Sequence, residues 1–168
     1  MRRKQKIGVL VVALVVMVLG GVLFVGAMAG WFGSAKVELS SEYYCEEECT
    51  GEVISLSTEE YEEMIAAKKS FVLFITQPGC YTGEKMRGYV TNYADEYDLK
   101  VFEMMFSDMK KTSLYPSVKH YPSVAVISEG KLVDALRTDS DEDAPAYNDE
   151  GEFGKWMGER VKVFGERL

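Results

Sequence analysis

The chain has 168 residues and a formal net charge of −8, a length that accommodates one domain of ordinary size and a further segment. Residues 34–168 contain all 27 acidic residues but only 15 of the 19 basic ones, so this part carries a net charge of −12. Such a balance argues against nucleic acid as a partner, because phosphates need a basic surface, and against tight docking on anionic lipid.

An apolar run at the beginning of the chain predicts a transmembrane helix. Residues 7–33 contain no charged side chain, and a helix of about 20 apolar residues is long enough to cross a bilayer. Residues 1–6 are basic, which favours the cytoplasmic face. We therefore expect a single-pass plasma membrane protein of bacterial type, with segment 7–33 in the lipid bilayer and an extracytoplasmic remainder. Cleavage of a signal peptide after Ala29 is the alternative, but the run is longer than such peptides usually have.

Residues 34–51 are polar and have no sustained period, so we interpret them as an extracytoplasmic linker to a domain at residues 52–168. The linker contains Cys45 and Cys49, separated by three glutamates. A local disulfide between the two is the favoured interpretation, because disulfides persist outside the cytoplasm. A metal site is not expected, since zinc needs four ligands and no second Cys or His cluster supplies them.

The domain begins with alternating strand and helix patterns. Residues 52–56 alternate as a short strand, and Ser57 with Glu60 forms a capping box for the helix that follows. Residues 71–76 are a continuous apolar run, typical of a strand covered on both faces. Residues 80–97 have an amphipathic helical pattern.

The second half continues this alternation and ends in a hairpin and a helix. Gly130 provides the positive φ that a tight hairpin turn needs. Further strands are predicted at residues 99–106, 124–128 and 131–136, and helices at residues 108–115 and 152–164. This order predicts an α/β domain with a mixed sheet, helices on both faces and an antiparallel edge.

Three features of the domain resemble the thioredoxin family, over roughly residues 52–164. A buried strand leads through residues 77–79 (Gln-Pro-Gly) to Cys80 at the start of a helix, and that helix continues to Ala-Asp-Glu-Tyr at residues 94–97. Residues 119–133, KHYPSVAVISEGKLV, are similar to the family's cis-proline segment with its strand, turn and strand. The resemblance implies a thioredoxin-like mixed sheet with helices on both faces.

The cis-proline segment is the most specific of these features. In the thioredoxin family the peptide bond before this proline is cis, and its loop lies against the reactive cysteine and pairs with bound peptide substrate. The resemblance therefore assigns substrate binding to Tyr121 and Pro122. Cis bonds are almost confined to proline, which makes this a narrow prediction.

The same resemblance places the reactive cysteine at Cys80, where the N-terminal end of a helix favours the nucleophilic thiolate. The sequence also departs from the family. Gly83 stands where a second cysteine would resolve a mixed disulfide, Phe74 where the family has a buried acid, and Gly79 where it has tryptophan. Glu84, close to the thiol, opposes its ionisation while it suits the helix dipole.

Three interpretations of Cys80 therefore stay open. It is a single-thiol site that exchanges disulfides with exported proteins, or it acts together with Cys45 or Cys49, or it is inert on a binding module tethered at the cell surface. Whether the protein is an enzyme is open for the same reason, and no cofactor is expected.

His120 and the acidic segment 138–150 are weaker candidates for functional residues. His120 is interpreted as a loop residue without a catalytic role, although it precedes Tyr121. The acidic segment 138–150 is interpreted as a solvated loop. Its carboxylates have the spacing of positions 1, 3, 5 and 12 of a calcium loop, but Ala144 stands where such a loop needs glycine. These carboxylates belong to Asp139, Asp141, Asp143 and Glu150.

Overall fold

The computed structural model describes residues 35–45 and 51–163 of the chain. Among these residues, no helix combines the length and the apolar character that crossing a bilayer requires. The transmembrane helix predicted for residues 7–33 lies outside the described residues, and so does Cys49. The membrane span and the disulfide between Cys45 and Cys49 therefore stay predictions.

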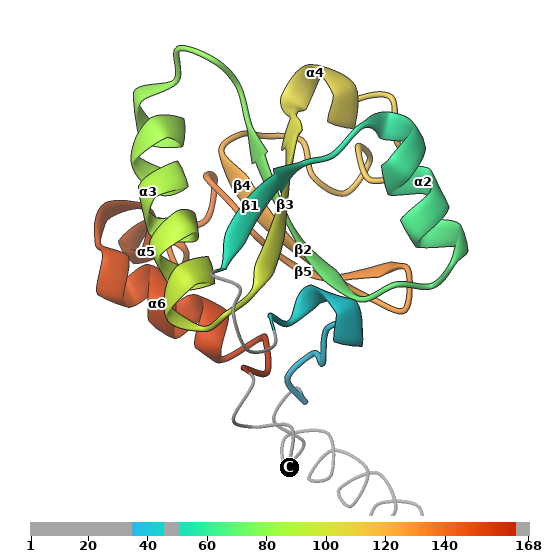
Figure 1. Ribbon diagram of the computed structural model, residues 1–168. Coiled ribbons are helices and arrows are strands. Elements are labelled where there is room, and N and C mark those ends of the chain that lie inside the picture. Colours follow the sequence, from blue (N-terminus) through green and yellow to red (C-terminus); the bar gives the residue numbers. More distant parts are fainter. Residues whose placement is uncertain (1–34, 46–50, 164–168) are drawn as a thin grey trace, which may run out of the picture. The chain divides into compact units, whose positions relative to one another are not determined.

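The described chain folds into a five-stranded mixed sheet with the order β1-β3-β2-β4-β5 (Figure 1). β3 runs parallel to both β1 and β2, whereas β4 runs antiparallel to β2 and β5. The mixed sheet with an antiparallel edge is therefore confirmed. The strands are β1 (Glu52–Ser55), β2 (Phe71–Thr76), β3 (Lys100–Met105), β4 (Ser123–Ser128) and β5 (Lys131–Leu136).

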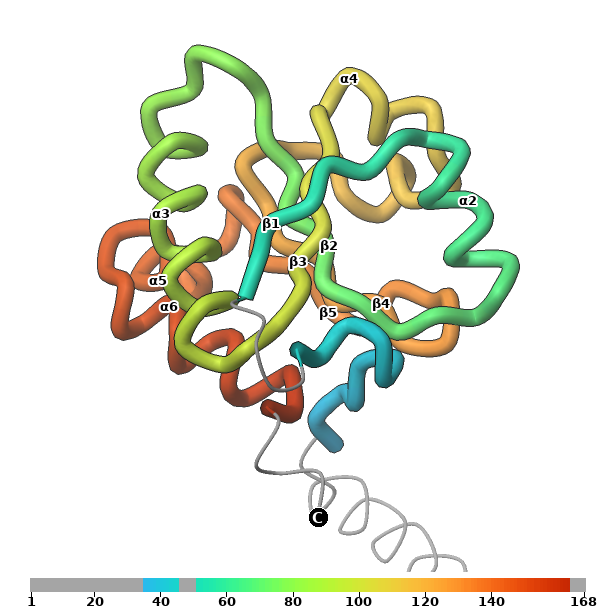
Figure 2. Tube along the Cα trace, viewed as in Figure 1, coloured from blue at the N-terminus to red at the C-terminus, as the bar shows by residue number. Residues whose placement is uncertain are grey.

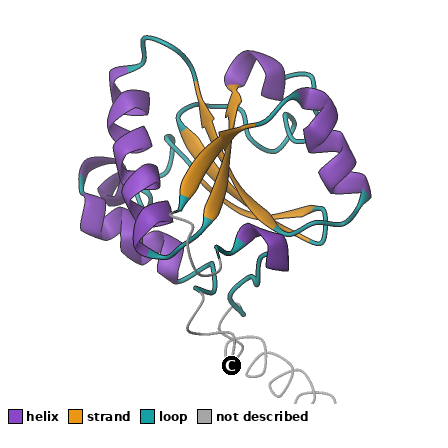
Figure 3. Ribbon diagram, viewed as in Figure 1, coloured by secondary structure: helices purple, strands orange, loops and turns teal. Residues whose placement is uncertain are grey.

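Helices cover both faces of this sheet, as predicted (Figure 3). On one face, Tyr61 packs against Phe71 with ring centroids 6.1 Å apart. On the other face, Tyr93 packs against Phe153 at 6.2 Å. The first face carries α2 (Thr58–Ala66) and α4 (Phe106–Met109), and the second carries α3 (Tyr81–Glu96), α6 (Glu150–Gly158) and the short α5 (Ala144–Asn148).

β2 is the centre of the hydrophobic core because its side chains are apolar toward both faces. Its first five residues are fully buried, and Leu73 pairs with Phe102 on β3 and Ala125 on β4. Side chains alternate along a strand, so the face of Leu73 looks toward α2 and the face of Phe74 looks toward α3. Each side chain of β2 thus belongs to one of two packed layers.

Two local predictions are confirmed in detail. The backbone N–H of Ser57 donates to the Glu60 carboxylate at 2.9 Å, and the Ser57 hydroxyl accepts from the Glu60 N–H at 3.2 Å. This capping box begins α2. The β4–β5 turn has positive φ at Glu129 and Gly130, 50° and 72°, which matches the twist of a two-residue hairpin.

Residues 36–45 differ from the linker that we expected. They form part of the domain, with Val37 in a parallel bridge to Val161 and Tyr44 in an antiparallel bridge to Leu99 (Figure 2). Val37, Tyr44 and the adjoining Cys45 are buried, and a 3-10 turn, η1 (Ser41–Tyr43), lies between the two bridges. The apolar side chains of the segment are all buried, so the domain begins before residue 52.

The acidic segment also differs from expectation. Residues 144–148 form α5, which buries Ala146 and Tyr147, and the Asp143 side chain is buried as well. The last helix, α6, begins at Glu150 and ends at Gly158, so it is shorter than the predicted 152–164. Val161 is fully buried, but by its pairing with the N-terminal segment and not on a helix.

A buried ion pair lies between β3 and α3. The Glu103 side chain is only 7 % exposed, and its two oxygens lie 2.5 and 2.6 Å from the Nη2 and Nη1 atoms of Arg87. Glu103 pairs with Phe74 in the sheet, so both side chains face α3. A buried carboxylate is costly without a partner, and Arg87 supplies that partner from the helix.

We predict that Arg87→Met lowers the free energy of unfolding by about 3 kcal/mol, because it leaves the Glu103 carboxylate buried without a counter-charge. The Arg87→Met/Glu103→Met double variant should recover most of this loss. Chemical denaturation followed by circular dichroism measures both. The control is Lys111→Met, which removes the exposed pair of Lys111 with Asp108 at 2.7 Å and should change stability by less than about 0.5 kcal/mol. Equal losses for the two single variants would contradict the prediction.

Candidate active site

Cys80 lies at the junction between β2 and α3, where the sequence placed it. It is the N-cap residue of α3, and its sulfur accepts a hydrogen bond from the Gly83 N–H at 3.4 Å. The thiol is free and its side chain is partly exposed. An N–H donor and the positive end of a helix both favour negative charge on a sulfur, which is the form that attacks disulfides.

The Tyr121–Pro122 loop lies at the same end of the sheet. The peptide bond between Tyr121 and Pro122 is cis, as predicted. Ser123 directly after the loop pairs with Ile75 near the end of β2, and the chain leaving β2 leads to Cys80. Figure 1 shows the beginning of α3 and the loop before β4 at this common end. The sheet register therefore brings the predicted thiol and the predicted substrate-binding loop to the same end of the sheet.

Exposed aromatic side chains lie at this end of the sheet. Tyr81, next to the thiol, is 84 % exposed, and Tyr121 is 39 % exposed. The Tyr121 ring lies 4.6 Å from that of Phe106, which in turn lies 6.4 Å from that of Tyr115. No sequence pattern indicated Phe106 and Tyr115, because only the fold brings the segment after β3 next to the loop. Tyr81, Tyr115 and Tyr121 expose aromatic surface here, whereas Phe106 is buried beneath Tyr121 and Tyr115.

At position 83, where the thioredoxin motif would have a second cysteine, the helix packs closely on Thr76. A Cβ atom built on Gly83 would lie 2.8 Å from the Thr76 hydroxyl oxygen and 3.6 Å from the Cys80 sulfur. Thr76 is buried at the end of β2. Glycine at position 83 therefore avoids a close contact with Thr76. Among the described residues, Cys80 is the single free thiol at this end of the sheet.

Cys45 lies at the opposite end of the sheet from Cys80. Its N–H donates to the Asp98 carbonyl at 2.7 Å, just before β3 begins, whereas Cys80 follows the C-terminal end of the parallel strand β2. The length of β3 between these ends is roughly 17 Å, and a disulfide needs Cα atoms within about 7 Å. The geometry therefore separates Cys45 from Cys80. A Cys45–Cys49 disulfide stays a prediction, because Cys49 lies outside the described residues.

His120 and the carboxylates of the acidic segment contact partners other than Cys80. The His120 Nε2 atom lies 3.9 Å from the Asp139 carboxylate, and both side chains are exposed. The Asp143 carboxylate accepts from the Arg137 N–H at 2.9 Å, and Glu150 accepts from Asn92 at 2.7 Å. No group of metal-binding side chains occurs within the part of the chain that the structure describes.

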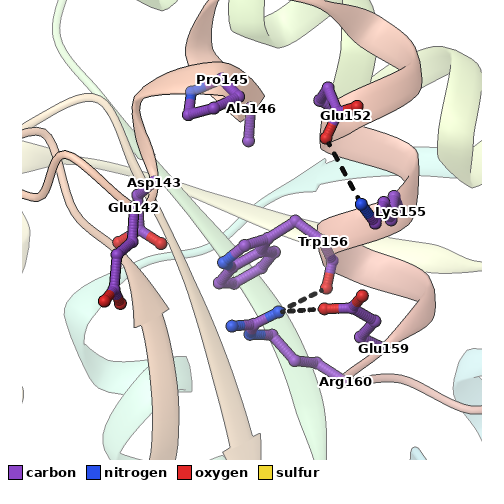
Figure 4. A pocket seen from close by; sticks show the side chains of 9 residues that line it. All are labelled: Glu142, Asp143, Pro145, Ala146, Glu152, Lys155, Trp156, Glu159 and Arg160. Carbon is purple, nitrogen blue, oxygen red and sulfur yellow. Dashed lines mark hydrogen bonds and ion pairs between the residues drawn. The ribbon is translucent and has the colours of Figure 1, made fainter.

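A pocket of about 200 Å³ lies elsewhere, between the acidic segment and α6 (Figure 4). Its charges are largely paired with each other. Lys155 lies 3.8 Å from Glu152, and the guanidinium group of Arg160 stacks over the Trp156 ring at 4.2 Å and donates to the Trp156 carbonyl at 3.0 Å. The pocket contains neither the thiol nor the Tyr121–Pro122 loop, so it is not part of the candidate active site.

Comparison with known proteins identifies the fold. No protein-family profile and no curated protein sequence matches the chain. Among solved structures it is similar to the thioredoxin NaTrxh of Nicotiana alata, with a TM-score of 0.53, 13% identity and coverage of 70% of this chain and 100% of that one. A mutant thioredoxin of Halobacterium salinarum NRC-1 has a TM-score of 0.52, 12% identity and coverages of 67% and 93%. Thioredoxin O1 of Arabidopsis thaliana, in the oxidized state, has a TM-score of 0.50, 13% identity and coverages of 67% and 99%.

These likenesses show a thioredoxin fold. The described residues thus have the thioredoxin-like α/β architecture that the sequence resemblance implied. At identities of 12% and 13% the likeness concerns the fold alone, and the chemistry must be argued from the residues of this chain.

The packing of Gly83 on Thr76 leads to a prediction about two glycines of α3. Gly88→Ala should raise the free energy of unfolding by up to about 1 kcal/mol, because alanine favours a helix and nothing lies within 4 Å of its new Cβ. Gly83→Ala should instead lower it by about 1–3 kcal/mol, because its Cβ collides with the Thr76 hydroxyl. Adding Thr76→Ala to Gly83→Ala should remove most of that loss. Chemical denaturation measures all three, and equal stabilisation by both alanines would contradict the prediction.

Proposed function

We propose that this protein carries out thiol–disulfide exchange through Cys80, using the Tyr121–Pro122 loop to bind the substrate peptide. The proposal depends on the position of one free, accessible sulfur at the N-terminal end of α3. This sulfur lies at the same end of the sheet as the Tyr121–Pro122 loop, which leads into β4. The thioredoxin fold is consistent with this use but does not by itself establish it.

The proposed reaction begins with the Cys80 thiolate. It attacks one sulfur of a substrate disulfide, the substrate S–S bond breaks, and a new S–S bond joins Cys80 to the substrate. The second substrate sulfur leaves as a thiolate and takes up a proton from water. No atom is lost, because one disulfide is exchanged for another.

A second thiol must then complete the cycle from outside the motif. Gly83 offers no sulfur, Cys45 lies at the other end of the sheet, and Cys49, four positions after Cys45, lies outside the described residues. We therefore propose that a thiol of the substrate or of a small thiol compound attacks the mixed disulfide and releases Cys80 as a thiolate. Such a cycle shuffles or transfers disulfides without a net redox change in the protein.

The proposed setting is the outer face of a plasma membrane, with residues 7–33 as the anchor and exported proteins with thiols or disulfides as partners. It is supported by the charge-free apolar run and by the basic residues before it. Disulfides also persist outside the cytoplasm, where exchange has substrates. This setting is independent of the chemistry assigned to Cys80.

The exchange proposal predicts that Cys80 in the native full chain forms a mixed disulfide with a disulfide-bonded peptide. The rate should rise with pH as the thiolate fraction grows, and excess thiol should reverse the adduct. Mass spectrometry of proteolytic fragments locates the adduct, and quenching at timed intervals gives the rate.

Cys80→Ser is the matched control, since it replaces only the sulfur and should abolish the adduct without loss of folding. A Cys80 thiol that reacts only after denaturation would overturn the proposal. In that case the fold and its aromatic edge serve as a binding module, and capture of a peptide without covalent attachment becomes the relevant measurement.

A further inference from the structure

We propose that Tyr147 of α5 is a positioning residue that holds the Tyr121–Pro122 loop in place for the substrate. The inference rests on the proposed exchange function, which it deepens by giving the acidic segment a role in the candidate active site. It arises from contacts between residues that lie far apart in the sequence.

The phenol group of Tyr147 reaches directly to the loop. Its oxygen lies 2.9 Å from the carbonyl oxygen of Pro122 and 2.9 Å from that of Leu136. The Leu136 carbonyl also accepts the Ser123 hydroxyl at 2.6 Å. Among the described residues no other donor reaches the Pro122 carbonyl, whereas the Leu136 carbonyl, which shares the single phenol proton, also has the Ser123 hydroxyl.

This hydrogen bond matters because Pro122 can use only one of its backbone groups for hydrogen bonding. Proline has no N–H, so the carbonyl is the one backbone group of Pro122 that a hydrogen bond can hold. Ser123, the next residue, is already held by pairing with Ile75. Tyr147 therefore anchors the last loop residue before the sheet begins, directly beside the exposed Tyr121 that we assign to substrate binding.

The phenol is well suited to act as a permanent donor. Tyr147 is 7 % exposed, and burial, with Asp143 nearby, raises its pKa well above the usual value for a tyrosine. It therefore keeps its proton through the pH range in which thiols ionise.

The acidic segment fixes Tyr147 in this position. The buried Asp143 carboxylate accepts the Arg137 N–H directly after β5, so the start of α5 is tied to the sheet. Pro145 lies in the first turn of α5, and its carbonyl accepts the Asp149 N–H at 3.0 Å, which closes the short helix. α5 is thus tied to the sheet at its start, one helical turn before Tyr147.

The test removes one hydroxyl from the native full chain. Tyr147→Phe should lower the rate of mixed-disulfide formation between Cys80 and a disulfide-bonded peptide of about ten residues by roughly 3- to 10-fold, as expected for one hydrogen bond. The rate with iodoacetamide, which is too small to use the loop, should stay the same. A general loss of structure would change both rates, so the ratio of the two rates reports positioning.

Tyr89→Phe is the matched control. The Tyr89 hydroxyl also reaches this segment, donating to the Asn148 carbonyl at 3.3 Å, but it is exposed and does not contact the loop. It should leave both rates unchanged. The same three proteins are compared by hydrogen–deuterium exchange of the fragment that contains residues 119–123. Exchange there should be faster in Tyr147→Phe and unchanged in Tyr89→Phe.

The outcomes separate this inference from the proposed function. An unchanged peptide rate in Tyr147→Phe, with a reactive wild type, overturns the positioning role and leaves exchange at Cys80 standing. A wild-type Cys80 that reacts with neither reagent overturns the exchange function, and hydrogen exchange then decides whether Tyr147 holds the loop. Unchanged hydrogen exchange overturns the anchor in either case.

Discussion

The hydrogen-bonded pairing of β2 with β3 on one side and with β4 on the other determines where the candidate site lies. A shift of one residue in either pairing would turn Phe74 from α3 toward α2 and disrupt both layers of the core. Because five of its side chains are fully buried, β2 resists such a shift. The register that remains places Ile75 beside Ser123, and so the chain leading to Cys80 beside the loop that contains Pro122.

Local patterns in the sequence were enough to predict most of the fold. The capping box at Ser57, the apolar run of β2 and the turn at Gly130 each involve residues close together in the chain. The errors fall on residues 36–45, on α5 and on the end of α6, and the first two segments have no strong period. Their buried side chains contact partners more than twenty positions away, and such contacts leave no local signal.

In the candidate site, too, some residues were predictable from local sequence patterns and others only from the packing of the fold. Cys80 was predicted from the change of pattern between a strand and a helix, and the cis bond before Pro122 from a resemblance in one short segment. The contribution of Thr76, which occupies the space beside Gly83, follows only from packing. The resemblance to thioredoxins also indicated the loss of a buried acid at Phe74, whereas the fold places a carboxylate on the neighbouring strand, at Glu103, with its own arginine.

The bridge between Val37 and Val161 brings the entry of the domain and its last described residues together, at the sheet end opposite Cys80. Val37 therefore lies at one pole of the domain, and the Cys80 sulfur lies at the other. A domain that is immobilised or fused at Val37 keeps the Cys80 sulfur directed away from the point of attachment. Partners can then approach the thiol from the open side without first passing the support.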